Sequence, residues 1–240
     1  MFKTTGEPSE YSKLEGFINS QSSYSRTLWV PQKQRFGYYS NSHPIISAQI
    51  LFNQFDNNKL LKQLAKKDSE KIIQESAVKF IIIPYDSQGE IFLDDRKYSE
   101  KEYQKTIDEV KKISWLKEIS GFGKIKVFEV PNPRNHFWLT GEGQVQVKQI
   151  SPVEYRAGLK NVQKGEILVF AEKFDKNWTA NSISVSFNGF NSFVLSRNGD
   201  YSLRIYFEPQ DWVNIGSIVS FLSLVSVLCL LIFGYTTKKW

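Results

Sequence analysis

The chain has 240 residues, of which 41% are hydrophobic, and a formal net charge of +6. The basic residues are spread along the chain in pairs such as Lys66-Lys67 and form no basic block, which argues against nucleic-acid binding. Cys229 is the only cysteine, so no intrachain disulfide can form. Stability must therefore come from the burial of apolar side chains.

The region before residue 134 mixes helix and strand patterns, which predicts a small α/β domain over residues 20–133. Strands are expected over 26–31 and 78–84, helices over 48–67, 69–77 and 99–113, and an antiparallel strand pair over 115–119 and 124–130. Asp68-Ser69 is the expected cap of the second helix. The run VKFIIIP is apolar throughout and rich in β-branched residues, as in strands that are buried on both faces. We therefore expect it at the centre of the sheet.

Two prolines and two glycines in PNPRNHFWLTGEG (131–143) interrupt this pattern and predict a domain boundary. Beyond it the apolar residues recur with period two, as they do along half-buried strands. Strand-length segments cover residues 144–150, 154–160, 166–174, 182–187, 191–196 and 201–207. Asn188-Gly189 and Asn198-Gly199 offer the positive φ that tight hairpins need. We predict an antiparallel, jelly-roll-like β-sandwich over residues 143–208, and an α+β fold class for the chain.

Residues 213–235 carry no charge, and 23 helical residues at 1.5 Å each exceed the roughly 30 Å hydrocarbon core of a bilayer. This predicts one transmembrane helix, followed by a short tail at 236–240. The lysine pair 238–239 follows the span, whereas Glu208 and Asp211 precede it. The positive-inside bias then places the C-terminus in the cytoplasm and the large preceding region outside it.

An extracytoplasmic body needs an export route, and residues 1–19 contain no apolar run of the signal-peptide type. We therefore expect the chain to be the C-terminal piece of a longer membrane protein, with residues 1–19 continuing from upstream spans. The alternative is a tail-anchored protein with a cytoplasmic body, in which the closing lysines would have to cross the membrane.

The sequence contains no nucleophile elbow, P-loop, C-x-x-C pair or H-E-x-x-H motif, so we predict no catalytic residue, metal site or cofactor. An acidic segment after the central strand contains Asp86, Asp94, Asp95 and Arg96. Open α/β sheets bind ligands at this end of their strands, and paired carboxylates can hold a divalent metal with a sugar diphosphate. The spacing differs from D-x-D, however, and the same residues also form turns and surface ion pairs.

A second candidate site follows the strand EILVFAEKF. Phe174 and Trp178 lie beside Asp175 and Asn177 there, and an aromatic plate with neighbouring donors and acceptors can bind the apolar face and hydroxyl rim of a sugar. The alternative is structural, because large aromatic residues also close the end of a sandwich core.

Several phrases occur together in one order, among them RTLWVPQKQRFGYYSNSHP, AVKFIIIPYDS and SPVEYRAGLKNVQKGEILVFAEKFDKNW. In this order they resemble the C-terminal extracytoplasmic region and last span of bacterial multi-spanning glycosyltransferases of the C superfamily (GT-C), similar to the arabinofuranosyltransferase-like and YfhO-like groups. The resemblance covers nearly the whole chain and implies sugar transfer from a lipid-linked donor. In such enzymes the catalytic acid usually lies in an early extracytoplasmic loop, which this sequence does not contain, so no catalytic residue is carried over.

We therefore expect a non-catalytic extracytoplasmic portion of a polytopic glycosyltransferase in the bacterial cytoplasmic membrane. It would bind an acceptor glycan or support the membrane part. The expected partners are the lipid bilayer, other transmembrane helices of the parent protein, and a glycan or lipid-linked sugar. The alternative is a single-span surface protein that binds glycans or proteins.

Overall fold

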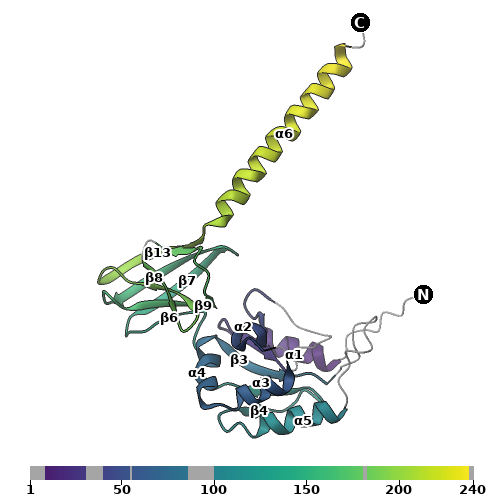
Figure 1. The fold of residues 1–240 in the computed structure, drawn as a ribbon, viewed down its shortest axis with the longest axis vertical. Helices are drawn as coiled ribbons and strands as arrows, with labels where there is room; N and C mark the ends of the chain where they lie inside the picture. Colours follow the sequence, from purple (N-terminus) through teal and green to yellow (C-terminus); the bar gives the residue numbers. More distant parts are fainter. Residues whose placement is uncertain (1–8, 31–39, 55, 86–99, 181–182, 238–240) are drawn as a thin grey trace, which may run out of the picture. The chain divides into compact units, whose positions relative to one another are not determined.

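A computed structural model describes residues 9–30, 40–54, 56–85, 100–180 and 183–237 of the chain (Figure 1). Over these ranges the chain forms six helices and three mostly antiparallel sheets, which confirms the predicted α+β class. The chain divides into two compact units. The first comprises Met1–Trp138 with Phe170–Lys173, and the second Leu139–Val169 with Phe174–Trp240.

The first unit contains a five-stranded sheet in the order β2-β1-β3-β5-β4. Its strands are β1 (Arg26–Trp29), β2 (Ile45–Ile46), β3 (Val78–Ile83), β4 (Lys117–Ile119) and β5 (Lys126–Glu129). β1 is parallel to β2 and β3, whereas β5 is antiparallel to both β3 and β4. β3 is the central strand, and all its residues except Lys79 are buried. The apolar run thus occupies the predicted place.

Helices cover both faces of this sheet. They are α1 (Ser9–Asn19), α2 (Ala48–Phe52), α3 (Asn57–Leu64), α4 (Lys67–Glu75) and α5 (Glu100–Lys111). Phe80 and Ile82 of β3 pack in one apolar cluster with α1, a helix that the sequence patterns did not predict. Ile81 and Ile83 pack in the other cluster, with apolar side chains of α3, α4 and α5. Because successive side chains of β3 point to opposite faces of the sheet, this one strand contributes to both apolar clusters.

The prediction of one continuous helix over 48–67 is wrong, because two separate helices, α2 and α3, occupy this range. α2 ends at Asn53, which adopts a left-handed conformation with φ 51° and donates its backbone N–H to the Gln49 carbonyl. A new helix then begins, because the Asp56 side chain accepts a hydrogen bond from the backbone N–H of Lys59 at 2.9 Å. The expected cap at Asp68-Ser69 is also wrong, since α4 already begins at Lys67.

The remaining strands form two four-stranded sheets, β10-β13-β8-β7 and β11-β12-β9-β6. The strands are β6 (Phe137–Leu139), β7 (Gln144–Ser151), β8 (Glu154–Val162), β9 (Ile167–Lys173), β10 (Trp178–Ala180), β11 (Ile183–Phe187), β12 (Phe190–Val194) and β13 (Gly199–Phe207). All six predicted strands occur. β6 and β10 were not predicted, and β6 lies within the stretch 131–143 that was predicted to be a domain boundary.

The two predicted hairpin turns have different outcomes. Asn188 and Gly189 have φ of 52° and 83° and join β11 to β12, with Phe187 opposite Phe190, as expected for a two-residue hairpin. The hairpin expected at Asn198-Gly199 is wrong. Gly199 has φ 93°, but β12 and β13 belong to different sheets, so this segment crosses from one sheet to the other.

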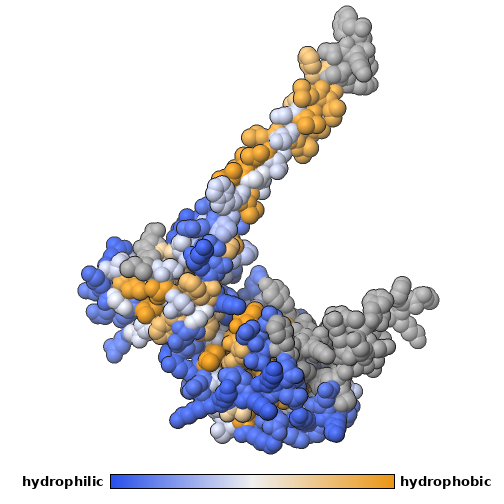
Figure 2. Space-filling model, in the orientation of Figure 1, coloured by the Kyte–Doolittle hydropathy of each residue, from blue (hydrophilic) through white to orange (hydrophobic). Residues whose placement is uncertain are grey.

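A single residue, Glu208, joins β13 to α6 (Pro209–Thr237). In the described part of the chain, this is the one helix that is long and apolar enough to cross a membrane, as predicted. Figure 2 shows apolar side chains along most of its visible length. Ser217, Ser223 and Ser226 donate their hydroxyls to carbonyls four residues back, at 2.8 to 2.9 Å. These hydrogen bonds satisfy the hydroxyls within the helix itself.

Two glycines of the second unit differ in the space around them, which gives a matched test of its packing. A Cβ on Gly143 would lie 2.6 Å from Val162 Cγ1 and 3.2 Å from Leu139 Cδ1, both in buried side chains. We expect Gly143→Ala to lower the free energy of unfolding by about 1–3 kcal/mol. At Gly158 the nearest atom to a Cβ is the Gln146 carbonyl oxygen at 3.7 Å, so Gly158→Ala should cause no loss. Chemical denaturation of the two variants measures the difference, and equal stabilities would contradict this account.

Candidate functional site

The sheet β10-β13-β8-β7 has one buried and one exposed face, because its side chains alternate. Tyr155, Ala157 and Leu159 of β8 are buried, as are Leu203 and Ile205 of β13. The opposite face carries Gln144, Gln146 and Lys148 from β7, Arg156, Gly158 and Lys160 from β8, and Asp200, Ser202 and Arg204 from β13. All of these except the half-buried Gly158 are exposed. At these positions the outer face is therefore polar, apart from Gly158.

A shallow groove lies on the outer face, with Gly158 at its floor. Gly158 is paired with Gln146 on one side and Ser202 on the other, so it occupies the middle of a row of three residues. Without a side chain there, the neighbouring side chains become walls. The groove has a volume of about 310 Å³ and is lined by Gln144, Gln146, Gly158, Leu159, Lys160, Asp200, Tyr201 and Ser202.

The lining offers hydrogen bonds of both kinds. Gln144 and Gln146 provide amide donors and acceptors, and Ser202 provides a hydroxyl that does both. Lys160 adds a cation and Asp200 a carboxylate, of which one oxygen accepts the backbone N–H of Asn161 at 2.8 Å. Such a lining fits a ligand with many hydroxyl groups better than an apolar one.

The sequence analysis missed this groove, although a signal was present. The strand segment EYRAGLK contains a glycine at an outward position, and an isolated glycine in a strand marks a close approach of another group to the backbone. The neighbouring walls come from β7 and β13, whose order beside β8 the sequence patterns did not predict.

The predicted sugar-binding residues Phe174, Asp175, Asn177 and Trp178 lie together in the turn between β9 and β10 and the start of β10. Asp175 Oδ1 accepts hydrogen bonds from the backbone N–H and the side-chain amide of Asn177, both at 2.9 Å. The Asp175 backbone N–H donates to Asn191 Oδ1 at 2.8 Å. These polar groups are thus engaged within the turn.

The same turn contacts Glu208, the residue that precedes α6. The Asn177 carbonyl accepts the backbone N–H of Glu208 at 3.0 Å. The Trp178 ring packs against the rings of Tyr155 and Phe207, with centroids 6.0 and 5.2 Å apart. Phe174 is 39% exposed and is the most accessible aromatic side chain of the turn. These contacts favour the structural alternative, and sugar binding here stays a prediction. Asp86, Asp94, Asp95 and Arg96 lie outside the described residues.

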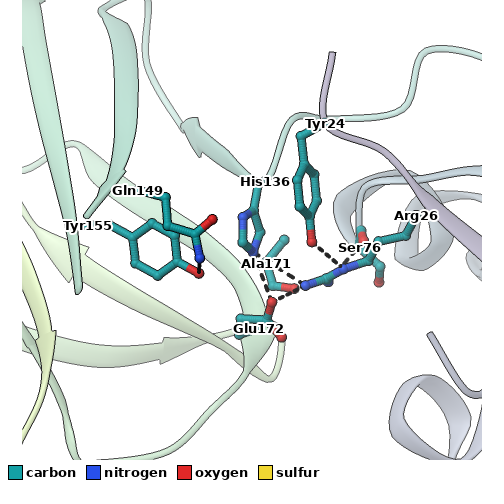
Figure 3. Close-up of polar contacts among 8 residues, drawn as sticks. All are labelled: Tyr24, Arg26, Ser76, His136, Gln149, Tyr155, Ala171 and Glu172. Carbon is teal, nitrogen blue, oxygen red and sulfur yellow. Dashed lines mark hydrogen bonds and ion pairs between the residues drawn. The ribbon is translucent and has the colours of Figure 1, made fainter. Parts of the chain in front are cut away.

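A partly buried ionic cluster in the first unit was also missed from the sequence (Figure 3). The Arg26 side chain at the start of β1 is only 4% exposed. It donates to the carbonyls of Ser76 and Ala171, to the Tyr24 hydroxyl at 2.9 Å, and to the Glu172 carboxylate, with which it forms an ion pair. Each part of the guanidinium has an acceptor, so the cluster ties β1 to the end of β9 and has a structural role.

His136 completes this cluster. Its ring stacks on the Tyr24 ring at 4.0 Å, and its Nε2 lies 2.9 Å from Glu172 Oε1. Burial lowers the pKa of His136, and the nearby positive charge of Arg26 lowers it further despite the hydrogen bond to Glu172. Burial alone would raise the pKa of Glu172, but the hydrogen bond from His136 and the charge of Arg26 outweigh it and lower that pKa. Among the described residues, no group of His, Cys, Asp and Glu side chains could hold a metal ion.

No protein-family model matches the chain, and no curated protein matches it. Among solved structures, the C-terminal globular domain of an oligosaccharyltransferase from Archaeoglobus fulgidus is similar, with 13% sequence identity and a TM-score of 0.28. The match covers 52% of this chain and 99% of that one. A likeness this low carries no argument about the function of this chain.

The two histidines of the chain predict a dependence of stability on pH. Burial lowers the pKa of both His43 and His136, whereas in the unfolded chain each titrates near its ordinary pKa of about 6.5. Below that pH the unfolded state therefore binds more protons, and the free energy of unfolding should decrease as pH falls from about 7 to about 5. The lowered pKa of Glu172 adds a loss of stability only at more acidic pH.

Urea denaturation between pH 7.5 and 5 measures this slope. In His136→Gln one titrating group is gone, so the slope should fall by up to about 1.4 kcal/mol per pH unit. Lys112→Gln, at an exposed position, is the control and should leave the slope unchanged. A slope in His136→Gln equal to that of the wild type would contradict the assignment of a buried, neutral imidazole.

Proposed function

We propose that this chain is the non-catalytic, extracytoplasmic portion of a membrane glycosyltransferase of the GT-C type, and that its sandwich binds a glycan in the groove over Gly158. The observation that carries the proposal is the groove itself. It is open, and its lining combines amide, hydroxyl, amine and carboxylate groups with the apolar surface of residues such as Leu159 and Tyr201. A sugar presents a rim of hydroxyls that both donate and accept hydrogen bonds, which is the complement of this lining.

The size and position of the groove also support this proposal. Its volume of about 310 Å³ lies at the lower end of small-ligand sites, which suits one or two sugar rings better than a folded partner. Because the groove lies on an exposed sheet face, a longer glycan could continue beyond it on either side. The phrases that resemble bacterial GT-C proteins support the assignment to a glycosyltransferase, and they include the strand that contains Gly158.

The membrane part of the proposal is based on α6. We propose that this helix crosses the bilayer with the lysine pair 238–239 in the cytoplasm and both folded units outside. The absence of charge between residues 213 and 235 supports the span, and the lysine pair after it supports this orientation, because the positive-inside bias counts Lys and Arg near the ends of a span.

The groove can be tested with a substitution that fills it. In full-length protein in nanodiscs, we expect binding to one or more members of a panel of bacterial envelope oligosaccharides, measured by isothermal titration calorimetry. Gly158→Val should weaken binding at least about tenfold, because the new side chain occupies the floor of the groove. It should not destabilise the fold, since the space above Gly158 is open and valine favours strands.

Phe174→Ala is the matched variant for the predicted site in the β9–β10 turn. If the groove is the binding site, Phe174→Ala should bind as the wild type does. Loss of binding in Phe174→Ala with retention in Gly158→Val would move the site to the turn. Failure of the wild-type chain to bind any member of the panel would refute glycan binding.

The proposed orientation makes a separate prediction. In a Cys229→Ser background, we expect a cysteine at Ser202 to react with a membrane-impermeant maleimide in intact cells, because Ser202 is exposed on the outer face. A cysteine at Lys239 should react only after the membrane is permeabilised. The opposite pattern of labelling would place the folded units in the cytoplasm and would be incompatible with the proposal.

A further inference from the structure

We propose that the glycan bound over Gly158 is acidic, with sugar carboxylates of the uronic-acid kind held by the cations that flank the groove. This inference rests on the proposed function and adds the charge of the ligand. Arg156 and Lys160 precede and follow Gly158 by two residues on β8, so both project from the outer face. At about 3.3 Å per residue, each cation starts roughly 7 Å from the groove floor.

The cations continue across the sheet as a row, which we call the basic row: Lys148, Arg156 and Arg204. In the strand register, Lys148 is opposite Arg156, and Arg156 is opposite Arg204. Like charges that are directly opposite on neighbouring strands destabilise a sheet. A row of three such residues next to the groove therefore costs stability in the free protein, and an anionic ligand would offset that cost.

The cations of the basic row differ in whether they have a hydrogen-bonded partner. Arg204 is bound by the Glu154 carboxylate through two hydrogen bonds, of 2.8 and 3.0 Å. The hydrogen bond from Arg204 lowers the pKa of Glu154, and the charge of Arg156 adds to this effect from a distance. Within the described ranges, Lys148 and Arg156 have no hydrogen bond or ion pair through their side chains. Two cations thus remain available beside the groove.

The Arg204–Glu154 pair indicates which anion suits this face. A guanidinium binds both oxygens of a carboxylate in one plane, and the chain's own carboxylate does so on Arg204. A ligand carboxylate could repeat this geometry on Arg156, one strand away. Asp200 is the one acid among the groove-lining residues, and one of its oxygens already accepts a backbone N–H. The lining itself, with Lys160 and Asp200, is formally neutral, so the positive charge beside the groove comes from the basic row.

An anionic membrane surface would also attract the basic row, but the observations favour a glycan. The unpaired cations flank a groove whose floor is bare backbone and whose walls are amides and a hydroxyl, so charge and hydrogen-bonding capacity converge on one place. A bilayer contacts protruding side chains and makes no use of a hollow between them.

The test compares an acidic oligosaccharide with its uncharged methyl ester. Full-length protein in phosphatidylcholine nanodiscs is titrated with oligogalacturonate and with its fully methyl-esterified form, together with the envelope panel that tests the proposed function. We expect the acidic form to bind at least about tenfold more tightly at low salt, and 0.5 M NaCl to remove most of this difference. Lys148→Gln/Arg156→Gln should remove most of the preference for the acid, because the remaining groove cation, Lys160, shares the lining with Asp200.

Lys62→Gln/Lys164→Gln removes the same charge from exposed positions that belong neither to the groove nor to the β9–β10 turn, and should leave the preference unchanged. Equal binding of the acid and the ester would overturn the inference, and so would a preference that is undiminished in Lys148→Gln/Arg156→Gln, while glycan binding itself would stand. Binding to none of the sugars would remove the proposed function as well. Binding only to vesicles that contain phosphatidylglycerol would assign the basic row to a lipid surface and would likewise overturn it.

Discussion

The alternation of side chains along β8 is the constraint on which the second unit depends. Because successive residues point to opposite faces, the burial of Tyr155, Ala157 and Leu159 forces Arg156, Gly158 and Lys160 outward. A shift of one residue in register would bury two cations and expose the core. The same constraint therefore fixes the core, the glycine at the floor of the groove and the positions of the flanking charges.

The partly buried ionic cluster of the first unit does not come from its central strand. That strand, β3, is apolar except for the half-buried Lys79, whose Nζ donates to Gln21 Oε1 at 2.7 Å. Polar specificity enters instead through Arg26, whose buried charge has an acceptor for each of its donor groups. The Glu172 side chain is 40% exposed, but loss of its carboxylate would leave the buried Arg26 charge without its ionic partner, which is unfavourable. The cluster thus selects the arrangement in which Arg26, His136 and Glu172 meet.

Features encoded by short sequence periods were predictable. β3 and the strands of the sandwich follow from apolar runs and from alternation, and the Asn188-Gly189 turn follows from its φ requirement. Features that depend on a single residue within an otherwise regular pattern were not predictable. Asn53 interrupts a helical apolar pattern without a proline or glycine to signal it. β6 and β10 have only three residues each, too few to express a period. The contact of Arg26 with Glu172 joins residues 146 positions apart, which no local pattern encodes.

β13 connects the candidate site to α6. It contributes Ser202 to the wall of the groove, Leu203 and Ile205 to the core, and Arg204 to the basic row, and α6 follows after Glu208. The five steps from Ser202 to Phe207 extend roughly 17 Å at 3.3 Å per residue. The contact between Glu208 and the β9–β10 turn holds this junction to the sandwich. With α6 in a bilayer, the groove would therefore stay within a few sugar rings of the membrane surface, so a glycan bound there would be one that is held or processed close to the membrane.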